Sequence, residues 1–169
     1  MKNKMMERVN RILASREYRD HLERNALREE SRPFCRHHFE HLLTVARLTY
    51  LLLLEEGCPF INRETAYAAG LLHDIGRWQE YDYGTDHALA SAEMAKTILK
   101  KVGFSNSETE LITRAIAQHR LKNHEQPHLS SLSRALAKAD QYSRLCFKCQ
   151  ARSECLTLDR QPHKEELIY

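Results

Sequence analysis

The segment "AAGLLHDIGRW", residues 68–78, places an imidazole and a carboxylate side by side among small and apolar residues. The Ala, Leu and Ile residues around His73 and Asp74 predict that both side chains are buried. A buried carboxylate without a partner costs on the order of several kcal/mol, even after its surroundings relax. The sequence must therefore supply something that compensates the charge of Asp74.

Ligand-type residues also fall on the apolar sides of other predicted helices: His41, His87, His119 and Asp140. His119, for example, follows Ile112 and Ile116 by seven and three residues, so it shares their helical face. Neutral imidazoles and carboxylates are preferred ligands of iron, zinc, manganese and related divalent ions. A divalent cation would supply the positive charge that Asp74 and Asp140 need, and the sequence therefore predicts a metal site.

Each of these residues also has an ordinary interpretation. A single histidine on an apolar face is usually a hydrogen-bonded core residue, and Asp140 alone could pair with Lys138 or Arg144. Five or six such residues in one small helical protein are harder to explain in this way. The metal site is the interpretation that accounts for all of them together.

The composition is that of a soluble globular protein, with 42% hydrophobic and 29% charged residues in a chain of 169. This length suits one domain with a real core. Only 5 Gly and 4 Pro are present, which disfavours a turn-rich β fold and favours long helices. The net charge of +3 is spread among acidic residues, so no concentrated basic stripe indicates a nucleic-acid partner.

Nothing in the sequence predicts contact with a membrane. The first twenty residues lack the apolar core of a signal peptide, and the longest apolar run, "LTYLLLL" at residues 48–54, is too short to span a bilayer. We therefore expect a cytoplasmic protein. In that compartment the five cysteines are expected to be metal ligands, reactive thiols or core residues rather than disulfides.

Helical periodicity runs through nearly the whole chain and predicts an all-α fold. Helices are expected over about residues 3–30, 36–56, 62–76, 87–103, 107–119 and 131–145, the fifth starting at a capping box in "SETE", residues 107–110, with Ser107 accepting and Glu110 reaching back. The stretch "YDYGTD" is expected to be a loop. We expect a charged helical segment over residues 1–32, a core over 33–145 and a cysteine-containing tail over 146–169 packed on that core.

The ordered ligand set resembles that of the HD-domain superfamily of metal-dependent phosphohydrolases. The motif positions are His41 in "EHLLTVAR", His73-Asp74 in "GLLHDIGR" and Asp140 in "LAKADQYSR". His87 in "DHALASAEMA" and His119 in "AIAQHR" match two further histidines of the branch that holds two metals. The resemblance covers residues 35–145 and is greatest to bacterial HD hydrolases that cleave dinucleoside polyphosphates at a di-iron site. It implies a single compact bundle of about six to seven helices.

The resemblance also implies roles for these residues. His41, His73, Asp74 and Asp140 would hold one metal, and Asp74, as a bridge, would share the second with His87 and His119. Fe or Mn would suit the site, with Mg or Zn as alternatives. A metal-activated hydroxide would then attack a nucleotide or another small phosphate ester or anhydride.

Four cations close in sequence to these ligands are candidates for binding the substrate's phosphates: Arg77, Arg120, Lys138 and Arg144. Relatives often carry Lys where this chain has Arg77, and a guanidinium suits phosphate clamping better than proton donation. Asp74 and Arg77 are thus the candidate catalytic residues, although each of the four cations could also be an ordinary surface residue.

The remaining histidines are not expected to be ligands. His38 either lies beside the ligands or is exposed, and His37 is expected to face solvent. His124, His128 and His163 lie in polar contexts and are expected to have no catalytic role.

The tail contains a C-x2-C-x5-C array in "CFKCQARSEC", and Cys35 lies six residues before His41. If the helices of His41 and Asp140 converge, these cysteines meet as a second site: Cys35, Cys146, Cys149 and Cys155. Four thiolates would hold a structural zinc ion or an iron–sulfur cluster. The alternatives are free thiols, or a Cys146 that packs as a small core residue. Cys58 is expected to be unrelated.

Two other functions remain open at this level. Some relatives use the same six-ligand di-iron pattern to activate oxygen, so an oxygenase is the first alternative. The second is a signalling module that binds a nucleotide without turnover. The sequence leaves the substrate, the metal and the choice between monomer and dimer undetermined.

Overall fold

The computed structural model describes residues 5–58, 60–121, 128–167 and 169. The described residues contain no strand and form eight α-helices: α1 (Glu7–Ala14), α2 (Arg16–Glu29), α3 (Phe39–Glu55), α4 (Arg63–Leu72), α5 (Arg77–Tyr83), α6 (His87–Val102), α7 (Asn106–Gln118) and α8 (Ser131–Tyr142). Three short 3₁₀ turns follow α8: η1 (Cys146–Lys148), η2 (Arg152–Glu154) and η3 (Leu158–Arg160). The all-α fold predicted from periodicity is therefore confirmed.

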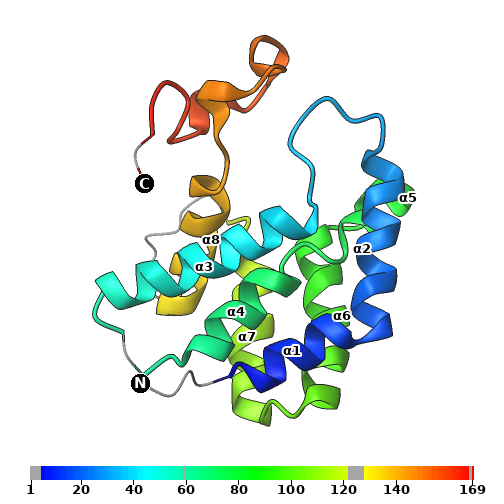
Figure 1. The fold of residues 1–169 in the computed structure, drawn as a ribbon, viewed down its shortest axis with the longest axis vertical. Coiled ribbons are helices and arrows are strands. Elements are labelled where there is room, and N and C mark those ends of the chain that lie inside the picture. Colours follow the sequence, from blue (N-terminus) through cyan, green and yellow to red (C-terminus); the bar gives the residue numbers. More distant parts are fainter. Residues whose placement is uncertain (1–4, 59, 122–127, 168) are drawn as a thin grey trace.

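The helices pack around one apolar core (Figure 1). α3 packs against α4 and α8, α6 packs against α7, and α4 joins the two groups through its contacts with α7. Fully buried residues such as Leu42, Leu71, Ile98 and Ile112 come from α3, α4, α6 and α7. No helix among the described residues has the length and apolar character needed to cross a bilayer.

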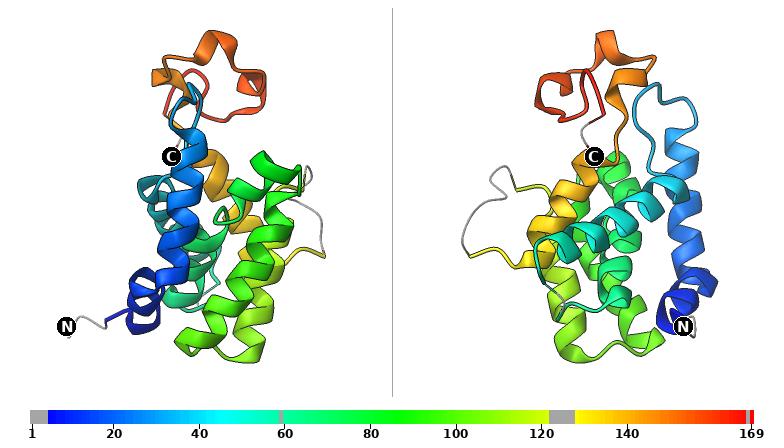
Figure 2. Two further views of the ribbon diagram at one scale, coloured as in Figure 1. Left: turned by 90° about the vertical axis from the view of Figure 1, so that its right-hand side faces the viewer. Right: turned by 60° about the vertical axis from the view of Figure 1, so that its left-hand side comes forward.

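The N-terminal segment forms two helices rather than the one that was expected over residues 3–30. Ser15 has an extended backbone and its side chain accepts a hydrogen bond from the Tyr18 amide at 3.2 Å, so it ends α1 and caps α2. Val9 and Ile12 of α1 are buried in the common core. Both helices lie along one side of the bundle (Figure 2). The division of the chain into segments 1–32, 33–145 and 146–169 stays a prediction.

Two other local expectations were wrong, the first of them in part. Of the loop expected over residues 81–86, residues 81–83 belong to α5, and residues 84–86 lie outside any helix. The capping box of α7 consists of Ser105 and Glu108, not Ser107 and Glu110: the Glu108 amide donates to Ser105 Oγ at 3.2 Å, and the Ser105 amide donates to Glu108 Oε2 at 3.0 Å. Ser105 and Glu108 have the same Ser-x-x-Glu spacing, and Glu108 also accepts from Arg8 Nη1 of α1 at 2.9 and 3.0 Å.

Two glycines bring the helices close enough to build a site. A Cβ at Gly70 would lie 2.3 Å from the Cα of Ala46, so α3 and α4 are in backbone contact. A Cβ at Gly76 would lie 2.6 Å from the Ser91 amide, and the Gly76 amide donates to Ser91 Oγ at 2.9 Å. These contacts hold the turn that carries His73 against α3 on one side and α6 on the other.

We predict that Gly70→Ala forces α3 away from α4. The expected loss is about 1–3 kcal/mol in the free energy of unfolding, typical of an overpacked core, together with weaker metal binding because His41 and His73 lie on the separated helices. Denaturant unfolding and metal analysis measure the two effects. Gly57→Ala is the matched control, since its Cβ would meet nothing within 4 Å and only its φ of +67° opposes alanine. A Gly70→Ala protein as stable as the control would contradict the prediction.

Glu108 gives a prediction about acid stability. Burial raises its pKa, but hydrogen bonds from Ser105 and Arg8 outweigh this and hold the pKa at about 2, against an ordinary value of 4.5. Its ionised form therefore stabilises the fold fully above about pH 4.5, and this contribution is lost as the pH falls towards 2. Glu108→Gln should cost about 1 kcal/mol at neutral pH, as cap losses do, and should flatten the pH dependence of unfolding in that window.

The control for this change is Glu110→Gln, an exposed glutamate on the same helix that pairs with Arg114 at 2.7 Å. It should leave both the stability and its acid dependence close to those of the parent chain. Identical acid profiles for Glu108→Gln and the parent would refute the role given to Glu108.

Candidate metal centre

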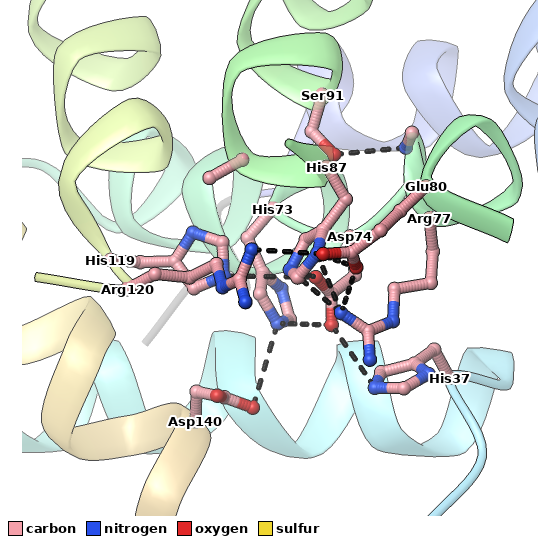
Figure 3. A network of polar contacts seen from close by, with 12 residues as sticks. His37, His73, Asp74, Arg77, Glu80, His87, Ser91, His119, Arg120 and Asp140 are labelled. Atoms are coloured by element: carbon pink, nitrogen blue, oxygen red, sulfur yellow. Dashed lines mark hydrogen bonds and ion pairs between the residues drawn. The ribbon is translucent and has the colours of Figure 1, made fainter. Parts of the chain in front are cut away.

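The structure brings the six candidate ligands together. Figure 3 labels His73, Asp74, His87, His119 and Asp140 among them. Each is delivered from the apolar side or the end of a helix: His41 of α3, His73 and Asp74 after α4, His87 at the start of α6, His119 after α7 and Asp140 of α8. All except His41 and Asp140 are buried, and those two are half-buried. The sequence expectation that separate helices point these side chains at one place agrees with this geometry.

Four of the residues form a first group. One ligand atom each from His41, His73, Asp74 and Asp140 lies within 4.8 Å of the others. His73 Nε2 is 3.2 Å from Asp74 Oδ2 and 3.7 Å from Asp140 Oδ1, and His41 Nε2 is 3.4 Å from Asp140 Oδ1. Two imidazoles and two carboxylates are thus arranged around one small volume.

A second group consists of Asp74, His87 and His119. His87 Nε2 is 3.0 Å and His119 Nε2 is 3.7 Å from Asp74 Oδ1. Asp74 belongs to both groups but uses different oxygens, because Oδ2 faces the first group and Oδ1 the second. A carboxylate placed in this way is suited to bridge two cations.

Hydrogen bonds at the far ring nitrogens orient three of the imidazoles. His73 Nδ1 is 2.8 Å from the Gly70 carbonyl and His119 Nδ1 is 2.7 Å from the Ile116 carbonyl. A carbonyl only accepts, so each Nδ1 carries a proton and each Nε2 is the ring nitrogen that faces Asp74 and is available to a metal ion. Glu80 does the same for His87, with its Oε2 2.5 Å from Nδ1.

The two buried carboxylates of the site, Asp74 and Asp140, are stabilised by positive charge around them. Burial opposes ionisation of Asp74 and Asp140, but the imidazoles around both, and Arg144 beside Asp140, hold the pKa of each carboxyl well below its usual range. Burial also opposes protonation of His73, yet the two carboxylates raise its pKa to about 10. His119, buried and close to His73, has a pKa lowered to about 4 and is a neutral ligand at ordinary pH.

Three inward-facing atoms of the site are buried and have no hydrogen-bond partner in the described part of the chain: His41 Nε2, His73 Nε2 and Asp74 Oδ1. Buried polar atoms of native proteins are nearly always satisfied. His41 Nε2 and His73 Nε2 belong to the first group and Asp74 Oδ1 faces the second, so one cation in each group would satisfy all three. The residues present therefore fit divalent metal ions.

Comparison with known proteins agrees with this geometry. The HD domain family model matches residues 38–145, a range that contains all six candidate ligands. The chain belongs to the HD-domain family.

The relatives differ in how much they share with this HD protein. An uncharacterized protein of Clostridium beijerinckii is 39% identical over 150 residues, which are 89% of this chain and 92% of that protein. Ribonuclease Y of Lawsonia intracellularis is 33% identical over 109 residues, 64% of this chain but 16% of the ribonuclease. The crystal structure of a predicted HD superfamily hydrolase from an uncultured Thermotogales bacterium has a TM-score of 0.59 and 27% identity, covering 82% of this chain and 67% of that one.

The expectation that His37 faces solvent was wrong. The side chain is buried, with Nε2 3.5 Å from Asp74 Oδ2 and Nδ1 2.5 Å from Glu29 Oε1. Glu29 is itself fully buried and also accepts from the Tyr81 hydroxyl at 2.7 Å. His37 lies in the loop before α3, so helical periodicity carried no information about its direction. His38, the next residue, is exposed, which is one of the two positions expected for it.

Asn25 of α2 is a second residue that the sequence did not point to. Its Nδ2 donates to the Asp74 carbonyl at 2.9 Å, and its Oδ1 accepts from the Trp78 amide at 2.8 Å. The side chain is almost fully buried. It therefore anchors the turn that carries His73 and Asp74 to α2. Because 49 residues separate Asn25 from Asp74, no local sequence pattern reveals this contact.

Three further histidines were expected to have no catalytic role. His163 is buried in the tail, His128 is exposed and His124 lies outside the described residues.

A cavity of about 430 Å³ opens beside the metal centre. It is lined by Arg32, Phe34, Cys35, His37, Arg77, Arg144 and residues 154–157 of the tail. Arg144 donates to both oxygens of Asp140 at 2.8 and 2.9 Å, and Arg77 donates to Glu80 Oε2 at 2.7 Å. Two of the four cations expected to bind phosphate thus reach a cavity that borders the metal centre.

The other two cations lie elsewhere. Arg120 is exposed and pairs with Glu80 at 3.0 Å and Asp86 at 3.1 Å, on the side of α5 and α6. Lys138 pairs with Glu56 at 3.5 Å, at the opposite end of α3 from His41. Fifteen helical residues separate those two positions, about 22 Å. Lys138 is therefore not at the cavity, because it lies on the face of α8 turned towards the C-terminal end of α3.

We predict that Asp74→Asn removes metal from the protein. The change keeps the shape of the side chain but takes away the shared negative charge, so metal bound per chain should fall at least tenfold while the helical circular dichroism remains. Elemental analysis after purification and reloading with Mn measures this. Asp82→Asn is the control, since that exposed carboxylate only pairs with Arg28. Equal metal content in the two variants would rule out the assignment of the ligands.

Proposed function

We propose that the protein is a metal-dependent phosphohydrolase that acts on a nucleotide or another small phosphate ester or anhydride. The observation that supports it best is the cavity, because its wall includes His37, which lies 3.5 Å from Asp74, and the guanidinium groups of Arg77 and Arg144. A phosphorylated molecule in this cavity would thus meet both the metal centre and fixed positive charge.

The metal would be held as the two ligand groups indicate, by His41, His73, Asp74 and Asp140 in one position and by Asp74, His87 and His119 in the other. When bound, two divalent ions supply a Lewis acid that neutralises phosphate charge and lowers the pKa of a water molecule. Fe and Mn are the preferred candidates, since the ligands are nitrogen and oxygen atoms.

The chain's own residues would bind and orient the substrate. Arg77 is partly buried, and its planar guanidinium suits two phosphate oxygens. Phe34 and Leu156 add apolar surface to the same cavity, and Arg32 lies 5.7 Å from the centre of the Phe34 ring. An aromatic ring and guanidinium groups in one cavity match a nucleobase joined to phosphates. A dinucleoside polyphosphate is one substrate of this class.

A substrate screen tests the proposal. Metal-free protein would be reloaded with Mn, Fe, Co, Ni or Mg and incubated with nucleoside mono-, di- and triphosphates, dinucleoside polyphosphates and sugar phosphates, with phosphate release and chromatography as readouts. Turnover that depends on metal and is lost in Asp74→Asn supports it. Tight nucleotide binding without turnover across the panel, or oxygen consumption by the reduced, iron-loaded protein with an organic substrate, would replace it with one of the other two functions.

We predict that Arg77→Ala lowers kcat/KM on the substrate so found by about 10–100-fold, since a hydrogen bond to a charged group contributes about 1.5–3 kcal/mol. Metal content should not change, because Arg77 is not among the candidate ligands. Arg77→Lys should recover part of the loss. Arg114→Ala, an exposed arginine of α7 paired with Glu110, is the control. Parent-like kinetics in Arg77→Ala would exclude this residue from substrate binding.

A further inference from the structure

The segment that follows α8 folds with little apolar burial. Between residues 146 and 157 it contains the 3₁₀ turns η1 and η2, and within this range only Cys146 and Ala151 are buried. The end of the chain is held separately, by Tyr169 stacked on Tyr142 with ring centres 5.3 Å apart. A segment with so small a core usually depends on a cross-link or a metal. We call residues 146–157 the cysteine segment, because three of its twelve residues are cysteines.

A fourth cysteine faces this segment from the loop between α2 and α3. The cavity beside the metal centre has Cys35 on one wall and Cys155 on another. A second cavity, of about 500 Å³, is also shared by the two parts, with Arg32, Pro33 and Phe34 opposite residues 150, 151 and 154. The loop and the cysteine segment therefore lie side by side at one end of the molecule (Figure 2).

A tight backbone turn holds two of the cysteines close together. In η1 the Cys149 amide donates to the Cys146 carbonyl at 3.1 Å, so one tight turn holds both residues. Burial raises the pKa of the Cys146 thiol, and the proximity of Cys35, Cys155 and Cys149 raises it further. Cys35 and Cys155 line one cavity and Cys146 and Cys149 share one turn, so these four cysteines lie in one region of the molecule, whereas Cys58 packs against the core cluster after α3.

A buried cation stands between this group and the metal centre. Arg144 binds Asp140 with one nitrogen, while its Nε is buried and has no hydrogen-bond partner among the described residues. The proximity of Cys35 contributes to the raised pKa of this guanidinium, after the larger effects of Asp140 and burial. A buried cation with an unused donor, close to Cys35, Cys146 and Cys155, would favour the thiolate form of these residues.

We propose that Cys35, Cys146, Cys149 and Cys155 bind an iron–sulfur cluster that fastens the cysteine segment to the loop before α3. Four thiolates suit either this cluster or a zinc ion. Zinc, with bonds of about 2.3 Å, needs tetrahedral sulfurs only about 3.8 Å apart. Within the described chain, no three cysteine sulfurs lie within 4.8 Å of one another. A cluster of several irons is larger than one ion and so takes thiolates that lie farther apart than those around zinc.

The test uses the full chain, purified without oxygen and reconstituted with iron and sulfide. Acid-labile sulfide, iron, zinc and visible absorption are measured for the parent, Cys149→Ser, Cys155→Ser, Cys58→Ser and Asp74→Asn. Sulfide is the decisive quantity, because iron at the His/Asp centre brings none. We expect sulfide and visible absorption in the parent, Cys58→Ser and Asp74→Asn, and their loss in Cys149→Ser and Cys155→Ser.

Limited trypsin digestion gives a second readout that does not depend on metal analysis. The cysteine segment offers Lys148 and Arg152 as cleavage sites. Cleavage there should be at least tenfold faster in Cys149→Ser than in Cys58→Ser, with helical circular dichroism and Mn binding at the His/Asp centre unchanged.

Three results would overturn the proposal. They are the absence of sulfide in the reconstituted parent, sulfide retained in both Cys149→Ser and Cys155→Ser, and one zinc per chain that is lost in those two variants. None of these results bears on the phosphohydrolase activity, whose own test is the substrate screen with Asp74→Asn.

Discussion

The buried carboxylate of Asp74 is the constraint on which the rest of the structure depends. Its two oxygens face two different sets of imidazoles, and Oδ1 has no hydrogen-bond partner within the described residues. A buried negative charge in this position is stable only if positively charged or hydrogen-bonding groups lie close to it. The close contact at Gly70, the bond from Gly76 to Ser91 and the anchor from Asn25 all act on the turn that carries Asp74.

Helix ends explain how so many ligands converge without strain. His73 and His119 follow α4 and α7 directly, where each Nδ1 bonds a carbonyl three residues earlier and each Nε2 is left free to face inward. His87 is the first residue of α6, and Asp86 caps that helix by accepting from the Ala88 amide at 2.8 Å. Termini allow side chains to leave the helix axis, so three imidazoles reach one carboxylate from three directions.

Much of this arrangement could be predicted from the sequence, because the ligands sit at helical spacing from apolar residues. Ile112, Ile116 and His119 show the principle, because residues on one buried face of a helix point towards the same part of the protein interior. Three features could not be predicted in this way. His37 lies in a loop, Asn25 reaches the Asp74 carbonyl from 49 residues away, and α5 has too polar a sequence to show a buried face. Each depends on a long-range contact, and local patterns carry no record of such contacts.

The boundaries of the family match explain why the family alone does not determine the substrate. The HD match covers residues 38–145 and includes every candidate metal ligand. The cavity beside the metal centre is lined by Arg77 and Arg144 from inside that range, but also by residues 32–37 and 154–157 from outside it. The candidate ligands therefore all lie within the family match, whereas the cavity that the proposed function assigns to the substrate is walled partly by a loop and a tail outside it.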